Sequence, residues 1–228
     1  MNNRLVPILI GLMAILYIFI VTSEPLAIKV TFKLIPMGLI IFYAWQKLPA
    51  SNGPPLRLIV IGLFFCMLGD GFIAVSFVAG LGAFLVGHLF YLTGFLKMSR
   101  MTKLRISAII PIGLYSLIIG SQLVASLSKA ENDALVIPVI AYMLVISLMA
   151  LSAILTGNRL AIAGSILFVI SDSILSWNMF VADIVYSDML IMATYYSAQF
   201  LIARSLASFR EAAGDTAAIP EPIAKKTF

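Results

Sequence analysis

The chain has 228 residues, of which 62% are hydrophobic and only 11% charged, with a formal net charge of +5. Its mean hydropathy is +1.09. An ordinary globular domain carries about 25% charged residues, so this composition excludes a soluble protein and leaves no length for a separate soluble catalytic domain. The lone cysteine, Cys66, excludes an internal disulfide and a cysteine-cluster metal site.

Apolar runs long enough to cross a bilayer follow one another along the chain. A transmembrane helix needs about 20 mostly apolar residues, and hydrocarbon offers no partners to the backbone polar groups of other structures. The sequence therefore predicts an all-α, polytopic membrane bundle with eight spans at 4–22, 28–47, 57–77, 80–98, 104–124, 135–156, 159–178 and 188–208. We interpret the first run as a retained helix, because it is long for a signal peptide and no Ala-x-Ala site follows it.

The basic residues support this arrangement of spans. If the N-terminus is cytoplasmic, cytoplasmic positions hold Arg4, Lys47, Arg57, Lys97, Arg100, Lys103, Arg105, Arg159, Arg204, Arg210, Lys225 and Lys226. The other side holds only Lys29 and Lys129, and Lys33 lies within the second span. The positive-inside rule therefore predicts that both termini are cytoplasmic. Residues 1–210 are expected to form a single transmembrane domain of the plasma or inner membrane, and the polar residues 211–228 a flexible cytoplasmic tail.

Two carboxylates, Asp70 and Asp172, lie deep inside predicted spans. An Asp at a helix centre costs about 2.5–3.5 kcal/mol on insertion scales, so such residues face the protein interior or water and suggest function by default. Each follows a glycine by eight residues, Gly62 and Gly164 respectively, in the third and seventh spans. This spacing suggests a four-plus-four internal repeat. The alternative is that each Asp only bonds helices together.

Three more polar residues lie in the predicted spans. His88, the single histidine, is one turn away from Tyr91, and it could be a base, a donor, a metal ligand or a packing residue. Lys33 lies about one turn into the second span. It could extend to the interface, receive a phosphate or pair with a buried carboxylate.

The last span adds Tyr195 and Gln199, which share one helix face. Asn178 ends the seventh span and could be a cap or a polar contact at the mouth of a site. With the N-terminus inside, all these residues fall in the middle-to-outer half of the bilayer. One wet pocket that opens toward the outer leaflet explains this shared layer.

The known catalytic patterns leave a carboxylate pair as the candidate chemistry. The sequence has no Gly-x-Ser-x-Gly elbow, no phosphate loop and no paired histidines that would support a zinc site. Two neighbouring buried carboxyl groups cannot both ionise cheaply, so one of Asp70 and Asp172 is expected to hold a proton and act as an acid.

Five short patterns, taken together, resemble the YhhN-type membrane proteins of the lysoplasmalogenase family. They are Lys33-Leu34-Ile35-Pro36-Met37, Gly69-Asp70-Gly71-Phe72, Gly87-His88-Leu89-Phe90-Tyr91, Ile170-Ser171-Asp172-Ser173 and Tyr195-Tyr196-Ser197-Ala198-Gln199. The resemblance covers about residues 28–207. It implies hydrolysis of the vinyl ether bond of lysoplasmalogens to a fatty aldehyde and glycerophospho-ethanolamine or glycerophospho-choline.

The resemblance suggests roles for the buried residues. One of Asp70 and Asp172 would donate a proton and the other would stabilise the cation and activate water. His88, Tyr91, Asn178, Tyr195 and Gln199 would contact substrate or water, and Lys33 would receive the phosphate. No metal or organic cofactor is expected. The expected partners are a lysophospholipid substrate and membrane lipids, without nucleic acid. Two other hypotheses stay open: a proton-coupled transporter that uses the same Asp pair, and a structural or lipid-binding membrane protein.

Overall fold

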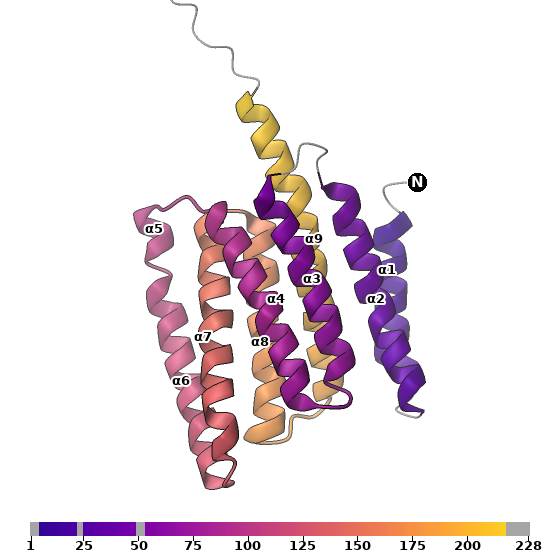
Figure 1. The fold of residues 1–228 in the computed structure, drawn as a ribbon, viewed down its shortest axis with the longest axis vertical. Helices are drawn as coiled ribbons and strands as arrows, with labels where there is room; N and C mark the ends of the chain where they lie inside the picture. The colour runs from indigo at the N-terminus through magenta and orange to yellow at the C-terminus, as the bar shows by residue number, and fades with distance from the viewer. Residues whose placement is uncertain (1–4, 22–24, 49–52, 218–228) are drawn as a thin grey trace, which may run out of the picture.

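The computed structural model describes residues 5–21, 25–48 and 53–217, and these residues form helices and short connections without a strand. The helices are α1 (Leu5–Phe19), α2 (Leu26–Lys47), α3 (Pro54–Phe72), α4 (Phe77–Lys97), α5 (Lys103–Ile106), α6 (Ile109–Lys129), α7 (Asp133–Thr156), α8 (Arg159–Phe180) and α9 (Ser187–Ala217). With the short helix α5 and α6 taken as one segment, they run alternately up and down in one bundle (Figure 1). The all-α polytopic bundle expected from the sequence is confirmed.

The helices match the predicted spans one for one, once α5 and α6 are counted as one segment. Within the described residues, six segments are long and apolar enough to cross a membrane: α2, α3, α4, the α5–α6 segment, α7 and α8. The shorter apolar helix α1 and the long helix α9 complete the bundle. The protein is therefore a multi-pass integral membrane protein.

Helix boundaries differ from the predicted ones by a few residues for local reasons. The Ser76 side chain accepts a hydrogen bond from the Ala79 amide and caps α4, which therefore begins at Phe77 and not at residue 80. Helix α3 ends at Phe72 and not at residue 77. Pro54 and Pro55 begin α3, where their missing N–H groups cost nothing. At the other end of the chain, α9 continues to Ala217, seven residues into the predicted tail. The remainder of that tail, 218–228, lies outside the described residues.

The two helix pairs that carry the buried acids are packed closely. Helix α3 contacts α4, and α8 contacts α9. A Cβ atom on Gly62 would lie 2.9 Å from the Gly87 carbonyl oxygen of α4, and one on Gly164 would lie 2.9 Å from the Ala198 carbonyl oxygen of α9. Only glycine allows such close approach of two helix backbones. Each close contact is two turns from an intramembrane Asp, so it fixes the height of that Asp in the bundle.

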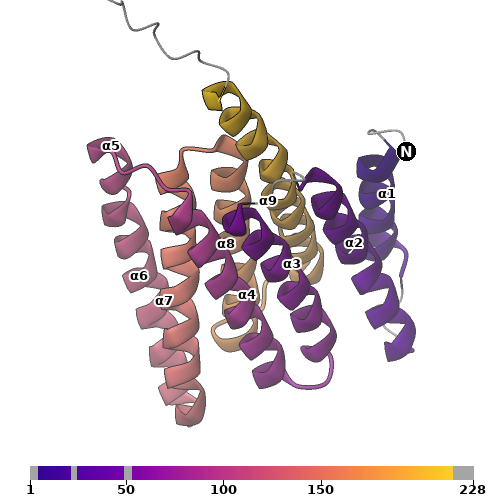
Figure 2. The ribbon, with the colours of Figure 1, turned by 45° about the horizontal axis from the view of Figure 1, so that its top comes forward.

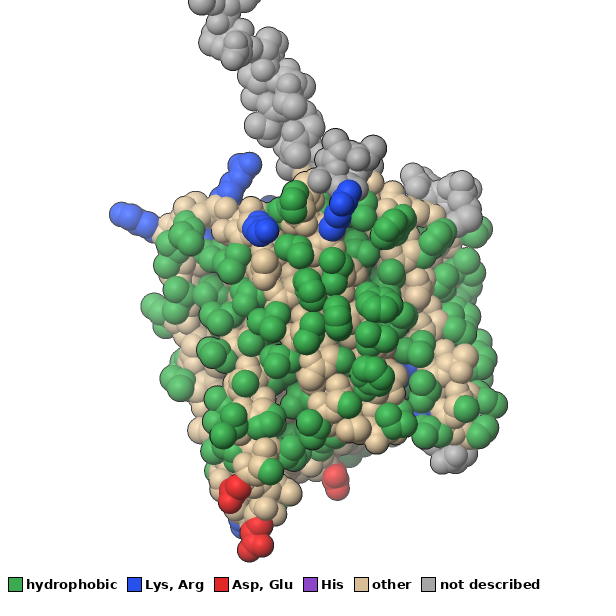
Figure 3. All heavy atoms as spheres, viewed as in Figure 1, with side chains coloured by type: hydrophobic (Ala, Val, Ile, Leu, Met, Phe, Trp, Pro, Cys, Tyr) green, Lys and Arg blue, Asp and Glu red, His purple; other side chains and the backbone are tan. Residues whose placement is uncertain are grey.

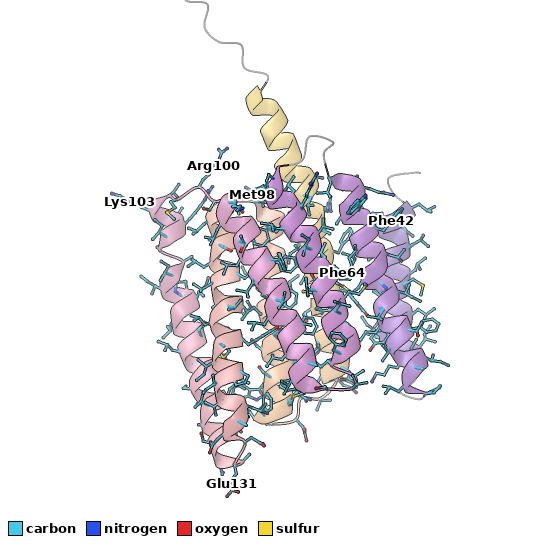
Figure 4. The ribbon with its side chains drawn as sticks, in the orientation of Figure 1. Phe42, Phe64, Met98, Arg100, Lys103 and Glu131 are labelled. Carbon is cyan, nitrogen blue, oxygen red and sulfur yellow. The ribbon has the colours of Figure 1, made fainter. Side chains whose placement is uncertain are left out.

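Helices α1 and α2 form one edge of the bundle and α6 with α7 the other, in both ribbon views (Figures 1 and 2). Apolar side chains cover the face seen in Figure 3, where most of the basic side chains in view lie at one end and the acidic ones at the other. Arg100 and Lys103 lie at the upper, basic end and Glu131 at the lower end (Figure 4). The start of α1 and the end of α9 share the basic end. The cytoplasmic orientation of that end stays a prediction.

Candidate active site

A cavity of about 380 Å³ lies inside the bundle, and both intramembrane carboxylates line it. Residues of α1, α2, α3, α4 and α6 to α9 contribute to its wall. Its lining also includes Lys29 near the start of α2 and Asp188 near the start of α9, and the Asp188 side chain is 88% exposed. The cavity therefore reaches the molecular surface at the end of the bundle opposite the basic end.

Asp70 is held by a cation and a hydrogen-bond donor. Its Oδ1 lies 3.1 Å from Lys33 Nζ, and the Tyr195 hydroxyl donates to its Oδ2 at 2.6 Å. The Asp70 side chain is 2% exposed and the Lys33 side chain 17%. Of the roles that the sequence left open for Lys33, the structure shows the ion pair with a buried carboxylate. A carboxylate with such partners is stabilised in its charged form.

Helix α9, which carries Tyr195, also contacts the backbone of Lys33. The hydroxyl of Tyr196 donates to the Lys33 carbonyl oxygen at 2.8 Å. Adjacent tyrosines of α9 therefore bind both members of the ion pair, one on α2 and one on α3. This arrangement makes the position of the pair depend on three helices.

Asp172 lies in different surroundings on α8. The Tyr142 hydroxyl of α7 donates to its Oδ2, and no cation of the described residues lies within ion-pair distance of it. Its side chain is partly exposed, and it lines the cavity. Asp70, with its cation partner, lines the same cavity. A carboxyl group favours its protonated form when it has no cation nearby and shares a site with a charged carboxylate.

Several residues predicted for the site lie behind the cavity wall. The Tyr91 hydroxyl donates to Gln199 Oε1 at 2.7 Å, and both side chains are fully buried. The His88 ring packs against Phe168, with centroids 4.5 Å apart, and against Tyr142 at 5.3 Å. None of the three predicted residues is part of the cavity lining.

The polar atoms of this buried group are incompletely paired. Among the described residues, the two ring nitrogens of His88 have no hydrogen-bond partner. The amide nitrogen of Gln199 has none either. The Phe84 carbonyl approaches the histidine ring without the geometry of a hydrogen bond. Asn178 lies elsewhere: its Oδ1 accepts from the Ile184 amide at 2.8 Å and shapes the α8–α9 connection. Substrate contact by these residues stays a prediction.

Tyr142, Lys29 and Asp188 also line the cavity and were not predicted as site residues from the sequence. Tyr142 lies in the middle of an apolar span and carries no charge, so the rule that singled out the buried acids does not apply to it. Lys29 and Asp188 were placed at span ends, where charged residues are common, and only the fold shows that they lie side by side, with Nζ and Oδ2 3.9 Å apart.

The described residues contain no cluster of three or more His, Cys, Asp or Glu side chains that could hold a metal ion. The site consists of two carboxyl groups, a lysine and tyrosine hydroxyls around a cavity that reaches the surface from within a membrane bundle. Such groups can donate a proton and stabilise a developing positive charge. Fold and site together define a polytopic membrane protein with an intramembrane acid pair.

Comparison with known proteins places the chain in a family. Residues 28–206 match the model of the YhhN family, and the chain belongs to this family. It is 29% identical over 204 residues to lysoplasmalogenase TMEM86B of Mus musculus, a match that covers 88% of this chain and 85% of that one. It is 30% identical over 229 residues to lysoplasmalogenase TMEM86A of Homo sapiens, covering 91% and 90%.

A bacterial protein is also similar. The chain is 29% identical over 176 residues to a lysoplasmalogenase of Mycobacterium tuberculosis, a match that covers 73% of this chain and 66% of that one. No solved structure matches the chain. The family resemblance expected from the five short patterns is confirmed.

Proposed function

We propose that this protein is a membrane hydrolase that cleaves the vinyl ether bond of alkenyl lysophospholipids. The products are a fatty aldehyde and glycerophospho-ethanolamine or glycerophospho-choline. The names of its relatives support this substrate class. One observation carries the chemistry: Asp70 and Asp172 line one cavity, and within the described part of the chain only Asp70 has a cation beside it.

Asp172 is the proton donor in this proposal. Hydrolysis of a vinyl ether begins when an acid adds a proton to the β-carbon of the double bond. Tyr142 donates to Oδ2 of Asp172, so the acid proton is placed on Oδ1. The β-carbon takes this proton, the double bond supplies the electron pair, and an oxocarbenium ion forms at the α-carbon.

Asp70 stabilises that cation. Lys33 and Tyr195 keep this carboxylate charged and fixed, and preorganised charge is effective in a site with little water. Water then attacks the α-carbon, and the carboxylate of Asp172 takes the proton that this water loses. The resulting hemiacetal collapses to the aldehyde and the glycerol hydroxyl. Asp172 is thus protonated again at the end of the cycle, as is the acid of glycosidases that pass through a similar cation. No metal or organic cofactor takes part.

One side of the cavity wall suits the hydrocarbon chain of the substrate. Toward α6 and α7 the cavity wall is mostly apolar, with Ile119, Leu123, Val139 and Met143. The charged residues Lys29, Lys33, Asp70 and Asp188 come from α2, α3 and α9. We therefore orient the substrate with its alkenyl chain toward α6 and α7 and its head group toward α2 and α9.

The test is aldehyde release by the purified protein in detergent. An alkenyl lysophospholipid should yield aldehyde, whereas the matched alkyl ether, which has no double bond to protonate, should yield none. In deuterated water, aldehyde trapped as it forms should carry one deuterium on the carbon next to the carbonyl. A metal chelator should leave the rate unchanged.

The control variant Glu131→Gln, at the α6–α7 connection, should keep the wild-type rate. Wild-type protein that releases no aldehyde would contradict the hydrolase and favour a transporter, which returns its substrate unchanged. Release without deuterium at that carbon would contradict β-carbon protonation.

A further inference from the structure

Two charged residues of opposite sign lie where the cavity meets the surface. Lys29, in the first turn of α2, and Asp188, in the first turn of α9, both line the cavity. Lys29 Nζ is 3.9 Å from Asp188 Oδ2, and the side chains are 34% and 88% exposed. Contacts this long between exposed groups contribute little to stability. The pair is therefore poorly explained as a device that holds α2 and α9 together.

The charged groups of the cavity have different opportunities to bind a ligand. Lys33 is bound to Asp70 at 3.1 Å, so its charge is already compensated. Lys29, with a longer contact and a larger exposed area, keeps donors directed at the cavity mouth. Asp188, the most exposed of the four charged groups, keeps acceptors for a cation. An anion and a cation could both bind here at once.

We infer that Lys29 and Asp188 form a subsite for a zwitterionic phospholipid head group, in which Lys29 binds the phosphate and Asp188 the ammonium group. This inference rests on the proposed function for the identity of the lipid. A two-carbon link joins phosphate and ammonium in ethanolamine and choline head groups, so neighbouring charges on two helices can contact both.

The order of exposure along the cavity fits this assignment. Asp188 is 88% exposed, Lys29 34% and Asp70 2%. A lysophospholipid presents its groups in the same order, with the ammonium outermost, the phosphate next and the ether bond beyond the glycerol. The subsite thus places the vinyl ether near the two carboxyl groups when the head group is bound at the mouth.

The experiment measures binding, so that it does not depend on turnover. Two alkyl ether lysolipids of equal chain length, which cannot be cleaved, are titrated into the purified protein in detergent. One carries phosphocholine and the other phosphate alone. The variants are Asp188→Asn, Asp188→Glu and Lys29→Gln. The matched control is Asp183→Asn, which removes an exposed carboxylate of the α8–α9 connection that does not line the cavity.

Asp188→Asn should weaken binding of the choline lipid about three- to fivefold, the size expected for a partly solvated ion pair. It should leave binding of the phosphate lipid unchanged or slightly stronger, and Asp188→Glu should retain the wild-type preference. Lys29→Gln should weaken both lipids, and Asp183→Asn neither.

Equal loss for both lipids in Asp188→Asn, or no loss for either, would overturn the ammonium contact. Unchanged binding of both lipids by Lys29→Gln would overturn the phosphate contact. Aldehyde release is measured in parallel with the alkenyl lipid. Selective binding without aldehyde release would contradict the proposed hydrolase and support the subsite. Aldehyde release without selective binding would support the hydrolase and contradict the subsite.

Discussion

Asp70 and Asp172 face one cavity from helices with the same local spacing of glycine and aspartate, yet their surroundings differ. Asp70 contacts Lys33 of α2 and Tyr195 of α9. Asp172 contacts Tyr142 of α7 and no cation of the described residues. The role of a buried carboxyl group therefore follows from its neighbours on other helices and not from its own segment. We expect a charged Asp70 and a protonated Asp172.

The largest effect should come from removal of the proton donor. Asp172→Asn retains an oxygen that can accept from Tyr142, but an amide cannot donate an acid proton. We expect aldehyde release to fall about a thousandfold, within the range for general acid catalysis, while lipid binding persists. Kinetics at saturating lipid measure this. A rate within tenfold of wild type would show that Asp172 is not the acid.

Asp70→Asn should have the next largest effect on rate, about a hundredfold, because the oxocarbenium ion loses its counter-charge. It also leaves Lys33, which is 17% exposed, without its carboxylate. We expect a loss of about 1–3 kcal/mol of stability, below the cost of breaking a fully buried pair. The thermal unfolding midpoint in detergent measures this loss.

A second substitution separates stability from catalysis at this ion pair. The double variant Asp70→Asn with Lys33→Met should recover the unfolding midpoint but not the rate. Recovery of both would indicate that the ion pair only holds helices together.

The hydroxyls beside the two acids should differ in how much their removal lowers the rate of aldehyde release. Tyr142→Phe removes the group that directs the proton of Asp172, and we expect about a tenfold loss of rate, equivalent to about 1.4 kcal/mol. Tyr195→Phe leaves Asp70 its lysine, and about a threefold loss should follow. The ratio of the two rates is the measurement. Equal losses would contradict the roles assigned to the acids, and a larger loss for Tyr195→Phe would reverse them.

The smallest effect is expected for His88→Phe. This ring packs among aromatic side chains and hydrogen-bonds neither carboxylate. A phenyl ring of similar shape should change the rate less than about twofold, because the catalytic groups keep their contacts. Aldehyde release by this variant, compared with Tyr142→Phe, tests the point. A hundredfold loss would place His88 in the proton path.

The helices could be predicted from the sequence, and so could the position of Asp70 and Asp172 inside the bundle. A long apolar run and a charged residue within it are local signals. Span ends were less accurate where a single side chain decides them, as Ser76 does for α4. Partners on other helices were not predictable in this way. Lys33 had several open roles, and the choice of Asp70 depends on how α2 packs beside α3.

Tyr142 and the pairing of Lys29 with Asp188 show the same limit. Residues 29 and 188 are far apart in the chain, and only the packing of α2 against α9 brings them together. The predicted single pocket also grouped His88, Tyr91 and Gln199 with the acids because of their similar depth. Depth alone does not say which way a side chain points around its helix, and these three point into the packed core.

The division of the cavity wall into a charged mouth and an apolar side has a consequence for turnover under the proposed chemistry. The glycerophospho product is soluble in water and leaves past Lys29 and Asp188, while the long-chain aldehyde prefers the hydrocarbon lining and the surrounding lipid. The two halves of the substrate are thus diluted into separate phases. Recombination becomes rare, and escape of the aldehyde becomes slower as its chain lengthens.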